Sequence, residues 1–540
     1  MRDKKMSRQY ILDCTLRDGG YCNEWRFGEE NIKKIINGLV MSEIDFIECG
    51  FLKDNLSYCK DISNFKNLDQ ISPFIAEKDR EKSYLAMINY GSYDISHLPP
   101  YDGSSIDGIR VAFHKPDVKE AMEWCAKIKE KGYQVFVQPM VTMNYTDEEF
   151  LNLIHMANVV KPYAFYIVDS FGVMKKNDLI RLFYLVENNL DKDIFIGYHA
   201  HNNMQLAYSN AQSLLAVNTS HKLIIDSSVY GMGRGAGNLN TELITEYLNE
   251  NFGKEYKLEP LLRIIDSVLT YFYNRSPWGY SLSNYLSARH NSHPNYAGYL
   301  DARKTLTVEN INEIFNMMDE EKKSNYDTEY IESLYFRYLE GRKEKHGIET
   351  LENFLKGKEV LIIAPGRTVD EERNTVLDYM NRDDIVSISV NFVYEYQEAD
   401  FIFVSNVRRF TELDKNLKGQ LIATTNIDCG YRNVLEVNYG SLLNQTKYVY
   451  DNAVLMLIKL LIKSKVEKIN IAGLDGYSLD RETNYIHANM ENINSRKIYK
   501  AVNSGIFKVL NDYADKTKLH FITEERYIPF GRLAEVKVYE

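Results

Sequence analysis

The sequence has few of the features that mark secreted, membrane-bound or nucleic-acid-binding proteins. Its six cysteines in 540 residues show no zinc-type pairing, which fits a reduced, cytoplasmic protein. The first ten residues hold no apolar signal core, and no apolar run is long enough to cross a bilayer, so we expect no membrane association. A formal net charge of −11 argues against a nucleic-acid surface. The cysteines are Cys14, Cys22, Cys49, Cys59, Cys125 and Cys429.

The composition is that of an ordinary globular protein, with 44% hydrophobic and 26% charged residues. A chain of this length is too long for one hydrophobic core, so we expect two or three domains. Changes in the hydrophobic pattern predict a first domain over residues 1–255, a helical extension over 256–350 and a further domain over 356–540.

In the first domain, short apolar runs alternate with amphipathic stretches. Roughly eight strand–helix repeats in about 250 residues is the count of a (β/α)8 barrel, although an open doubly wound sheet gives a similar alternation. The barrel is favoured because polar side chains follow the apolar runs, and a barrel gathers such strand ends at one mouth. The expected strands are QYILDC, IDFIECG, SYLAMIN, IDGIRVA, YQVFVQPM, AFYIVDS, DIFIGYH and KLIIDSSV, and expected helices include 29–40, 117–131, 147–160 and 204–217.

The rest of the chain contains two different patterns. Residues 258–345 read as helices without strands, around the aromatic and histidine-rich segment PWGYSLSNYLSARHNSHPNYAGYL. From residue 356, the runs VLIIAPGRT, IVSISV, DFIFVS, LIATT and KINIAG predict an α/β domain with a mostly parallel sheet. VLIIAPGRT and INIAGLDGYS faintly resemble a Rossmann-like domain of pterin diphosphokinase-like and glycosyltransferase-like proteins. Arg367 and Asp475 are hypothetical residues of a nucleotide or sugar-phosphate cleft.

The strongest chemical pattern pairs an Arg-Asp turn with two histidines. Arg17 and Asp18 follow the first expected strand, while His199 and His201 stand two residues apart at the end of another, where side chains share one face. One carboxylate and two imidazoles suit a divalent metal. A cation beside that metal would neutralise a developing oxyanion from a second side. The alternatives are two core histidines and a local salt bridge at the turn.

Two further features lie at expected strand ends. The run GMGRGAGN ends at Asn238 and enters a helix after the eighth expected strand, where barrels often bind anions. The alternative is a flexible loop with Asn238 as a helix cap rather than a residue that faces the metal. Glu48 lies at the end of the second expected strand and either orients Arg17 or forms a purely structural ion pair.

LDCTLRDGG, IRVA, YHAHNN and SSVYGMGRGAGNLNTE together resemble the metal-dependent aldolase and lyase barrels. These barrels include 4-hydroxy-2-oxovalerate aldolase, hydroxymethylglutaryl-CoA lyase and the isopropylmalate synthases. The resemblance covers about residues 8–300. It implies that Asp18, His199 and His201 hold a divalent metal, Mn²⁺ or Mg²⁺, with Asn238 as an additional ligand. It also implies that Arg17 stabilises a pyruvate enolate.

Departures from the family pattern point to one branch. The glycine loop lacks the cysteine of the lyases and the glutamate of the acyl-CoA synthases, and it looks most like that of the 4-hydroxy-2-oxo acid aldolases. Those aldolases carry a histidine base where this chain has Tyr21, and a phenol with a pKa near 10 is a poor base at neutral pH. Tyr280 resembles an aldolase tyrosine that lies over the site, with core packing as the alternative. His290, His293 and Tyr296 are further candidates for a base.

We therefore expect a carbon–carbon lyase, a metal-dependent aldolase that cleaves or forms a 4-hydroxy-2-oxo acid through a pyruvate enolate. The expected partners are small molecules, a 2-oxo acid and an aldehyde, with a homo-oligomer left open. One alternative is a Claisen-type transfer from an acyl-CoA to a 2-oxo acid. Another is a catalytically degenerate barrel whose C-terminal domain binds a nucleotide or a sugar phosphate.

Overall fold

The structure divides the chain into two compact units. The computed structural model describes residues 8–302, 306–340, 347–413, 419–430, 434–446, 448–478, 484–487, 490 and 499–525. One unit contains residues 1–298 and 319–326, and the other contains residues 299–318 and 327–540. The segment 256–350, expected as one helical extension, is thus divided between the two.

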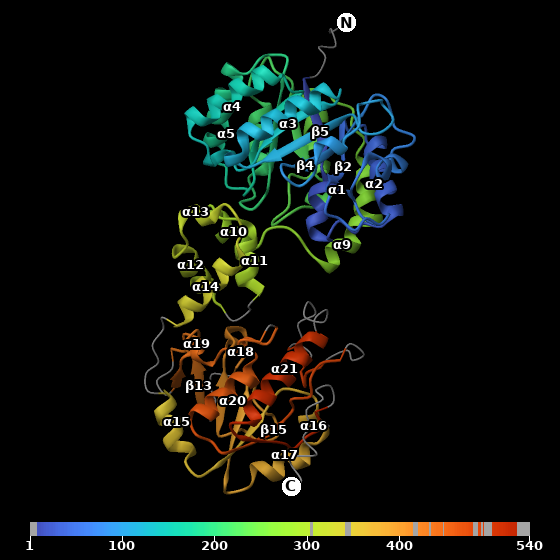
Figure 1. The fold of residues 1–540 in the computed structure, drawn as a ribbon. Coiled ribbons are helices and arrows are strands. Elements are labelled where there is room, and N and C mark those ends of the chain that lie inside the picture. Colours follow the sequence, from blue (N-terminus) through green and yellow to red (C-terminus); the bar gives the residue numbers. More distant parts are fainter. Residues whose placement is uncertain are drawn as a thin grey trace. The chain divides into compact units, whose positions relative to one another are not determined.

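The first unit is built on a closed barrel of parallel strands (Figure 1). Its strand order is β1-β9-β8-β7-β6-β5-β4-β2, and pairing of β1 with β2 closes the ring, while the short β3 pairs in parallel with the end of β2. This closure confirms the (β/α)8 barrel over the open sheet. The strands are β1 (Gln9–Asp13), β2 (Phe46–Leu52), β3 (Asn64–Phe65), β4 (Ser83–Asn89), β5 (Gly108–Phe113), β6 (Gln134–Pro139), β7 (Ala164–Asp169), β8 (Phe195–Ala200) and β9 (Leu223–Ser227).

Helices follow most barrel strands, close to where the sequence places them. Between β4 and β5, however, the described chain forms only the 3-10 turn η4 (Ile95–His97). Residues 90–107 are rich in Gly, Pro, Ser and Asp, which favour turns over helices. The helices are α1 (Thr15–Asp18), α2 (Glu29–Met41), α3 (Val118–Glu130), α4 (Asp147–Val160), α5 (Lys176–Asn189), α6 (Ala207–Leu215), α7 (Thr241–Phe252) and α8 (Leu258–Ile264).

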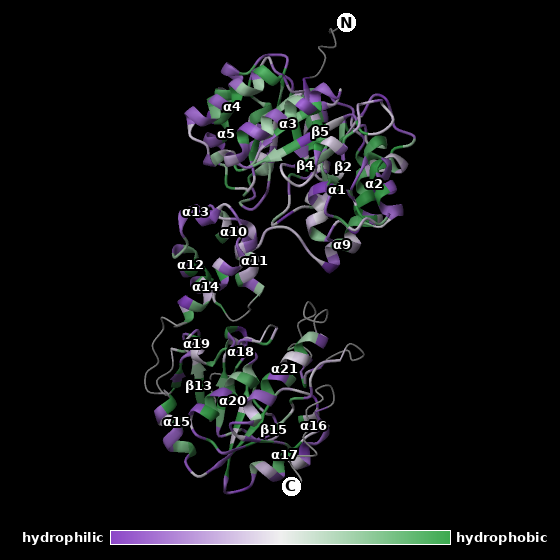
Figure 2. Ribbon diagram, in the orientation of Figure 1, coloured by the Kyte–Doolittle hydropathy of each residue, from purple (hydrophilic) through white to green (hydrophobic). Residues whose placement is uncertain are grey.

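Apolar side chains fill the barrel and its junction with the helices. All seven residues of β2 are buried, which explains why the strands read as continuous apolar runs. Phe46, Phe136 and Ile224 belong to a cluster of residues contributed mainly by the strands. Figure 2 shows largely hydrophobic strands and helices of mixed polarity around them. The packed barrel therefore holds the strand ends in fixed positions.

The described residues of the sequence from 270 to 355 are largely helical. None of the helices in the described ranges is both long enough and apolar enough to cross a membrane. The helices are α9 (Thr270–Arg275), α10 (Leu282–Arg289), α11 (Pro294–Ala302), α12 (Val308–Asn316), α13 (Glu320–Lys323), α14 (Thr328–Glu340) and α15 (Gly347–Leu355).

The second unit contains a seven-stranded parallel sheet of order β14-β13-β12-β11-β10-β15-β16. This confirms the expected α/β domain. Asp475 is 3% exposed and accepts hydrogen bonds from the Thr368 amide (3.1 Å) and hydroxyl, which joins the loops after β10 and β15. The Arg367 side chain is 44% exposed, so the structure does not bring it into a buried cleft with Asp475. The strands are β10 (Glu359–Ile363), β11 (Ile385–Val390), β12 (Phe401–Val404), β13 (Gln420–Thr424), β14 (Val434–Val437), β15 (Lys468–Ala472) and β16 (Lys518–Phe521).

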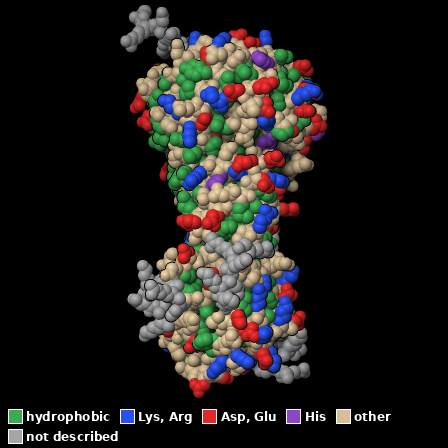
Figure 3. Space-filling model, turned by 90° about the vertical axis from the view of Figure 1, so that its left-hand side faces the viewer, with side chains coloured by type: hydrophobic (Ala, Val, Ile, Leu, Met, Phe, Trp, Pro, Cys, Tyr) green, Lys and Arg blue, Asp and Glu red, His purple; other side chains and the backbone are tan. Residues whose placement is uncertain are grey.

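Helices alternate with these strands along the chain, and the apolar α20 contributes seven buried side chains to the core of the second unit. On the face shown in Figure 3, acidic and basic side chains are interspersed in each unit. The helices are α16 (Thr368–Glu371), α17 (Arg373–Met380), α18 (Val407–Glu412), α19 (Tyr439–Leu442), α20 (Ala453–Lys463) and α21 (Tyr499–Ala514).

Candidate metal centre

The turn after β1 places Arg17 and Asp18 at the mouth of the barrel. The Asp13 carboxylate accepts the Thr15 amide hydrogen bond at 2.9 Å, and the short helix α1 begins there. The amide of Asp18 donates to the Cys14 carbonyl at 2.8 Å. Both charged side chains are thereby turned inward, and Arg17 and Asp18 are 5% and 1% exposed.

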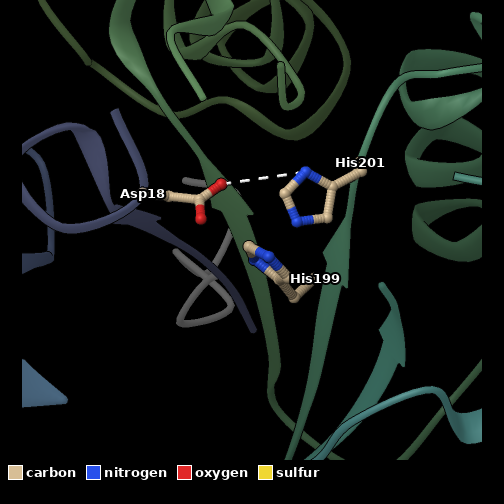
Figure 4. Close-up of side chains that lie close together, drawn as sticks. All are labelled: Asp18, His199 and His201. Carbon is tan, nitrogen blue, oxygen red and sulfur yellow. Dashed lines mark ion pairs between the residues drawn. The ribbon is translucent and has the colours of Figure 1, made fainter. Parts of the chain in front are cut away.

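His199 lies near the end of β8 and His201 directly follows the strand, both on the side of Asp18. In Figure 4 both imidazoles lie beside the Asp18 carboxylate, and the dashed line joins His201 Nδ1 to Asp18 Oδ2 at 3.8 Å. One ligand atom from each of the three residues lies within 4.8 Å of the others. Three buried donors at this spacing form a candidate site for a divalent ion.

A carboxylate behind His199 sets the orientation of its ring. His199 Nδ1 lies 3.0 Å from Asp226 Oδ2, so the hydrogen on Nδ1 is assigned to this bond. Nε2 is then left with a lone pair for a metal ion. A carboxylate that holds a ligating histidine in this way is the common arrangement around protein-bound metals.

A buried network of charges joins these groups to Arg17. Arg17 Nε donates to Glu48 Oε2 at 2.9 Å and its Nη1 to Asp18 Oδ1 at 2.7 Å. Arg110 donates to the same Glu48 oxygen at 2.8 Å and also to Asp226. Arg17 Nη2 is buried without a hydrogen-bond partner among the described residues. Glu48 therefore orients Arg17, and one guanidinium nitrogen remains available for a substrate oxygen.

Asn238 completes the candidate centre from the glycine loop. Its Nδ2 donates to Asp18 Oδ2 at 2.5 Å, and residues 201 and 238 form a β-bridge. Its Oδ1 is buried and has no hydrogen-bond partner in the described chain. This unpartnered amide oxygen, the Asp18 carboxylate and the two imidazoles together form a set of ligands that suits a hard or borderline divalent ion. The residues present thus fit the metal that the sequence implies.

The electrostatics keep these donors in the protonation states that bind a cation. Burial would raise the pKa of Asp18, but the charge of Arg17, helped by the two histidines, holds it well below its usual range. Burial lowers the pKa of His201 to about 4, so its imidazole is neutral at pH 7. A carboxylate that is ionised beside a neutral imidazole is ready to coordinate without losing protons.

The two predicted catalytic tyrosines lie in different surroundings. Tyr21 is 41% exposed, and its ring lies 4.8 Å from that of Trp25 and 5.3 Å from the Arg234 guanidinium carbon. Partial burial raises the pKa of Tyr21, and Arg234 offsets this only in part, so the phenol stays protonated at pH 7. Tyr280 is 59% exposed with its ring 6.5 Å from Tyr285, and no contact of the described residues brings it to Asp18. Both roles remain predictions.

The structure separates the three candidates for a base. Tyr296 is fully buried and donates to the carbonyls of Lys322 and Asn325 at 2.8 and 2.6 Å, which indicates packing. His290 is partly buried at the end of α10. His293, by contrast, lies against the glycine loop, with Nδ1 3.2 Å from Arg234 Nη2.

Some residues of the site were not assigned a role from the sequence. Asp226 lies near the end of β9 and Arg110 lies inside β5, and no sequence motif indicates that Asp226 would hold His199 or that Arg110 would hold Glu48. Arg234 lies in the glycine loop GMGRGAGN, and the loop motif assigns it no role. Its contact with Tyr21 and His293 depends on two other segments, which only the fold brings together.

We expect Gly233→Ala to weaken divalent-ion binding about tenfold or more, by displacing Asp18 and Asn238. A Cβ at Gly233 would lie 3.0 Å from Asp18 Oδ2 and closer still to Asn238 Nδ2. Isothermal titration calorimetry with Mn²⁺ measures the affinity. The control is Gly298→Ala, where a Cβ meets nothing within 4 Å. Equal Mn²⁺ affinity in both variants would contradict this arrangement.

His293 is expected to make stability fall with acid. Burial, followed by the charge of Arg234, lowers the pKa of His293 to about 3, below the ordinary value near 6.5. Below pH 6.5 the unfolded chain therefore binds a proton at His293, whereas the folded chain binds it only near pH 3. Protonation thus favours the unfolded state, and the free energy of unfolding decreases as the pH falls. Between pH 6 and pH 5 the free energy of unfolding should drop by about 1 kcal/mol more in wild type than in His293→Gln. Urea unfolding at both pH values measures the difference, and identical pH slopes would refute it.

The fold and the site together define the class of protein: a closed (β/α)8 barrel with a candidate metal centre of two histidines and an aspartate at its mouth.

The family model described as HMGL-like matches residues 107–268. A 4-hydroxy-2-oxovalerate aldolase of Geobacillus genomosp. 3 is 28% identical over 264 residues, 48% of this chain and 74% of the relative. An oxaloacetate decarboxylase of Mycobacterium tuberculosis is 22% identical, over 50% of this chain and 79% of the relative. A solved N-terminal domain of a proposed aldolase from Bacteroides vulgatus shows 25% identity and a TM-score of 0.47, over 54% of this chain and 96% of that chain. The match to the HMGL-like model is thus confined to part of the barrel.

Proposed function

We propose that the barrel is a divalent-metal-dependent aldolase that cleaves or forms a 4-hydroxy-2-oxo acid through a pyruvate enolate. The single observation that carries this proposal is the buried Arg17 Nη2 without a partner, beside the cluster of Asp18, His199 and His201. The names of the relatives, 4-hydroxy-2-oxovalerate aldolase and oxaloacetate decarboxylase, support it, because both activities pass through an enolate of pyruvate.

The residues of the site would have two roles, to hold the metal and to stabilise the enolate. Asp18, His199 and His201 would hold the metal, with Asn238 Oδ1 able to join them, and the bound ion would polarise the 2-oxo carbonyl. Arg17 donates from Nη2 to the oxygen on which charge develops, and its position is fixed in advance by Glu48 and Asp18. Preorganisation of this kind stabilises the enolate without reorganisation during the reaction.

A further group must remove the proton of the aldehyde-derived hydroxyl during cleavage, or supply a proton to the aldehyde oxygen during condensation. Tyr21 stays protonated at pH 7, which suits a hydrogen-bond donor or an acid rather than a resting base. Tyr21 lies three residues from Asp18 on the same turn, and η1 (Gly19–Cys22) contains it. We assign Tyr21 the role of a donor to the aldehyde oxygen in the condensation direction.

Two alternatives remain open to test. A Claisen-type transfer from an acyl-CoA is disfavoured because the glycine loop lacks the glutamate of that branch. A degenerate barrel, with nucleotide or sugar-phosphate binding by the C-terminal domain, is the second alternative, because Tyr21 stands where the related aldolases have a histidine base, and its raised pKa makes it a poor base. A location in the cytoplasm, a homo-oligomer and the choice of Mn²⁺ or Mg²⁺ also stay predictions.

The test is cleavage of a panel of 4-hydroxy-2-oxo acids with added Mn²⁺, measured as pyruvate release. The proposal expects pyruvate and the matching aldehyde in equal amounts, and loss of both on chelation. Incubation of acyl-CoA with pyruvate tests the Claisen alternative through release of free thiol. Thiol release without pyruvate release from any hydroxy-oxo acid would replace the proposal with that alternative.

A further inference from the structure

Arg234 lies on the rim of the candidate metal centre. Its neighbour Gly233 packs against the site so closely that a Cβ there would be 3.0 Å from Asp18 Oδ2. The Arg234 side chain is held from two sides, by the ring of Tyr21 at 5.3 Å and by His293 Nδ1 at 3.2 Å. A guanidinium held in this way belongs to the same loop that packs against the centre at Gly233.

The charge of Arg234 is not balanced by a neighbour. Arg17 is paired with Asp18 and Glu48, and Arg110 with Glu48 and Asp226. No carboxylate of the described chain lies within ion-pair distance of Arg234, although the residue is partly buried. A partly desolvated cation without a counter-ion favours binding of an anion.

Neutral donors surround this cation. Nδ1 of His293 accepts hydrogen bonds from Arg234 and from the Asn295 amide, at 3.2 Å each, so the ring hydrogen is assigned to Nε2. His293 is therefore a hydrogen-bond donor here. The Tyr21 hydroxyl is a second donor that stays protonated at pH 7.

The backbone of the glycine loop adds further donors. Among the hydrogen bonds of the described residues, none uses the amides of Gly233, Arg234 or Gly235. Gly235 adopts a left-handed φ of 66°, a conformation found where consecutive amides form an anion-binding concavity. Its neighbour Ala236 is fixed through its amide to Asn203 Oδ1 at 2.8 Å.

The exposure of the side chains around the centre indicates which part of a substrate each of them would contact. Asp18, His199 and His201 are 1%, 4% and 7% exposed, whereas Tyr21 is 41% exposed. Arg234 lies with Tyr21, farther out than the centre where the 2-oxo acid would bind. We place the aldehyde-derived end of the substrate in this direction, because the 2-oxo end would occupy the buried centre.

We propose that Arg234, with the His293 imidazole and the free amides of residues 233–235, binds an anionic group on the aldehyde. The substrate class is then an aldehyde that carries a carboxylate or a phosphate several bonds from its carbonyl. This inference rests on the proposed aldolase function and narrows its substrate.

The experiment compares aldehydes matched in length but not in charge, in condensation with pyruvate. Succinic semialdehyde is set against butanal, and glyceraldehyde 3-phosphate against glyceraldehyde. In wild type, kcat/KM should favour one anionic aldehyde about 10–100-fold over its neutral match. Arg234→Gln should remove that preference, and Arg234→Lys should keep part of it. The preferred anion distinguishes a carboxylate from a phosphate.

Arg263→Gln on α8 is the matched control, because Arg263 is exposed on the same unit and should leave the preference unchanged. A readout without turnover is calorimetric titration with succinate and with inorganic phosphate. Arg234→Gln should weaken binding of the preferred anion about tenfold or more, and Arg263→Gln should not.

The outcomes separate this inference from the proposed function. Pyruvate condensation with equal rates for charged and neutral aldehydes, or a preference that survives Arg234→Gln, overturns the inference and leaves the aldolase intact. If no aldehyde reacts but Arg234→Gln still abolishes anion binding, the anion site stands and the aldolase fails.

Discussion

Replacing Arg17 with lysine is expected to lower kcat for pyruvate-enolate chemistry by about 10²–10³-fold. Arg17 Nε and Nη1 are engaged by Glu48 and Asp18, and only its third nitrogen is left for the substrate. A lysine carries one ammonium group and cannot hold two carboxylates and a developing oxyanion in this fixed geometry. The effect should therefore appear mainly in kcat rather than KM.

The measurement is steady-state kinetics with saturating Mn²⁺, with bound metal determined in parallel. Arg26→Lys is a matched control, because Arg26 is exposed a few residues farther along the same segment. Wild-type kcat in Arg17→Lys would show that Arg17 only supports the fold. Loss of bound metal in the variant would assign the defect to Asp18 instead.

Arg110→Met should lower the free energy of unfolding by about 3–5 kcal/mol, the largest stability effect that we expect in the barrel. Arg110 is fully buried and links Glu48 to Asp226. Methionine fills much of the same space but leaves two buried carboxylates that have lost a shared cation. The cost arises because Glu48 would keep only Arg17, and Asp226 only His199, to offset its buried charge, rather than from a cavity.

Guanidinium unfolding of the full chain, followed for the barrel, gives the value. Arg181→Met is the control, because Arg181 forms an exposed ion pair with Asp147, and such pairs contribute about 0–1 kcal/mol. A loss below 1 kcal/mol for Arg110→Met would mean that the network adds little to stability. Equal losses in the two variants would have the same meaning.

The architecture could be predicted because its signals are local. The apolar runs matched the barrel strands, and helix 147–160 was placed correctly since Thr146 and Glu149 form a capping box at its start. The choice of a closed barrel over an open sheet rested on strand ends such as Asp18 and His199. The pairing of β1 with β2 that closes the ring is a long-range contact without a sequence signal of its own.

The candidate site was predictable in part for the same reason. Asp18, His199 and His201 stand in short motifs, and the structure brings them together. The roles of Asp226, Arg110 and Arg234 depend on contacts across 27, 62 and 59 positions of the chain. Spacing along a sequence does not report such contacts. Tyr280, chosen by resemblance alone, is largely exposed.

The measurement that tests the central claim most directly is decarboxylation of oxaloacetate by wild type and His199→Ala, with and without Mn²⁺. This reaction forms the pyruvate enolate without the unknown aldehyde, so it depends only on Arg17 and the candidate metal centre. The account predicts pyruvate release that needs Mn²⁺ and is abolished in His199→Ala. No turnover and no bound metal in wild type would contradict it, and would direct attention to the C-terminal domain.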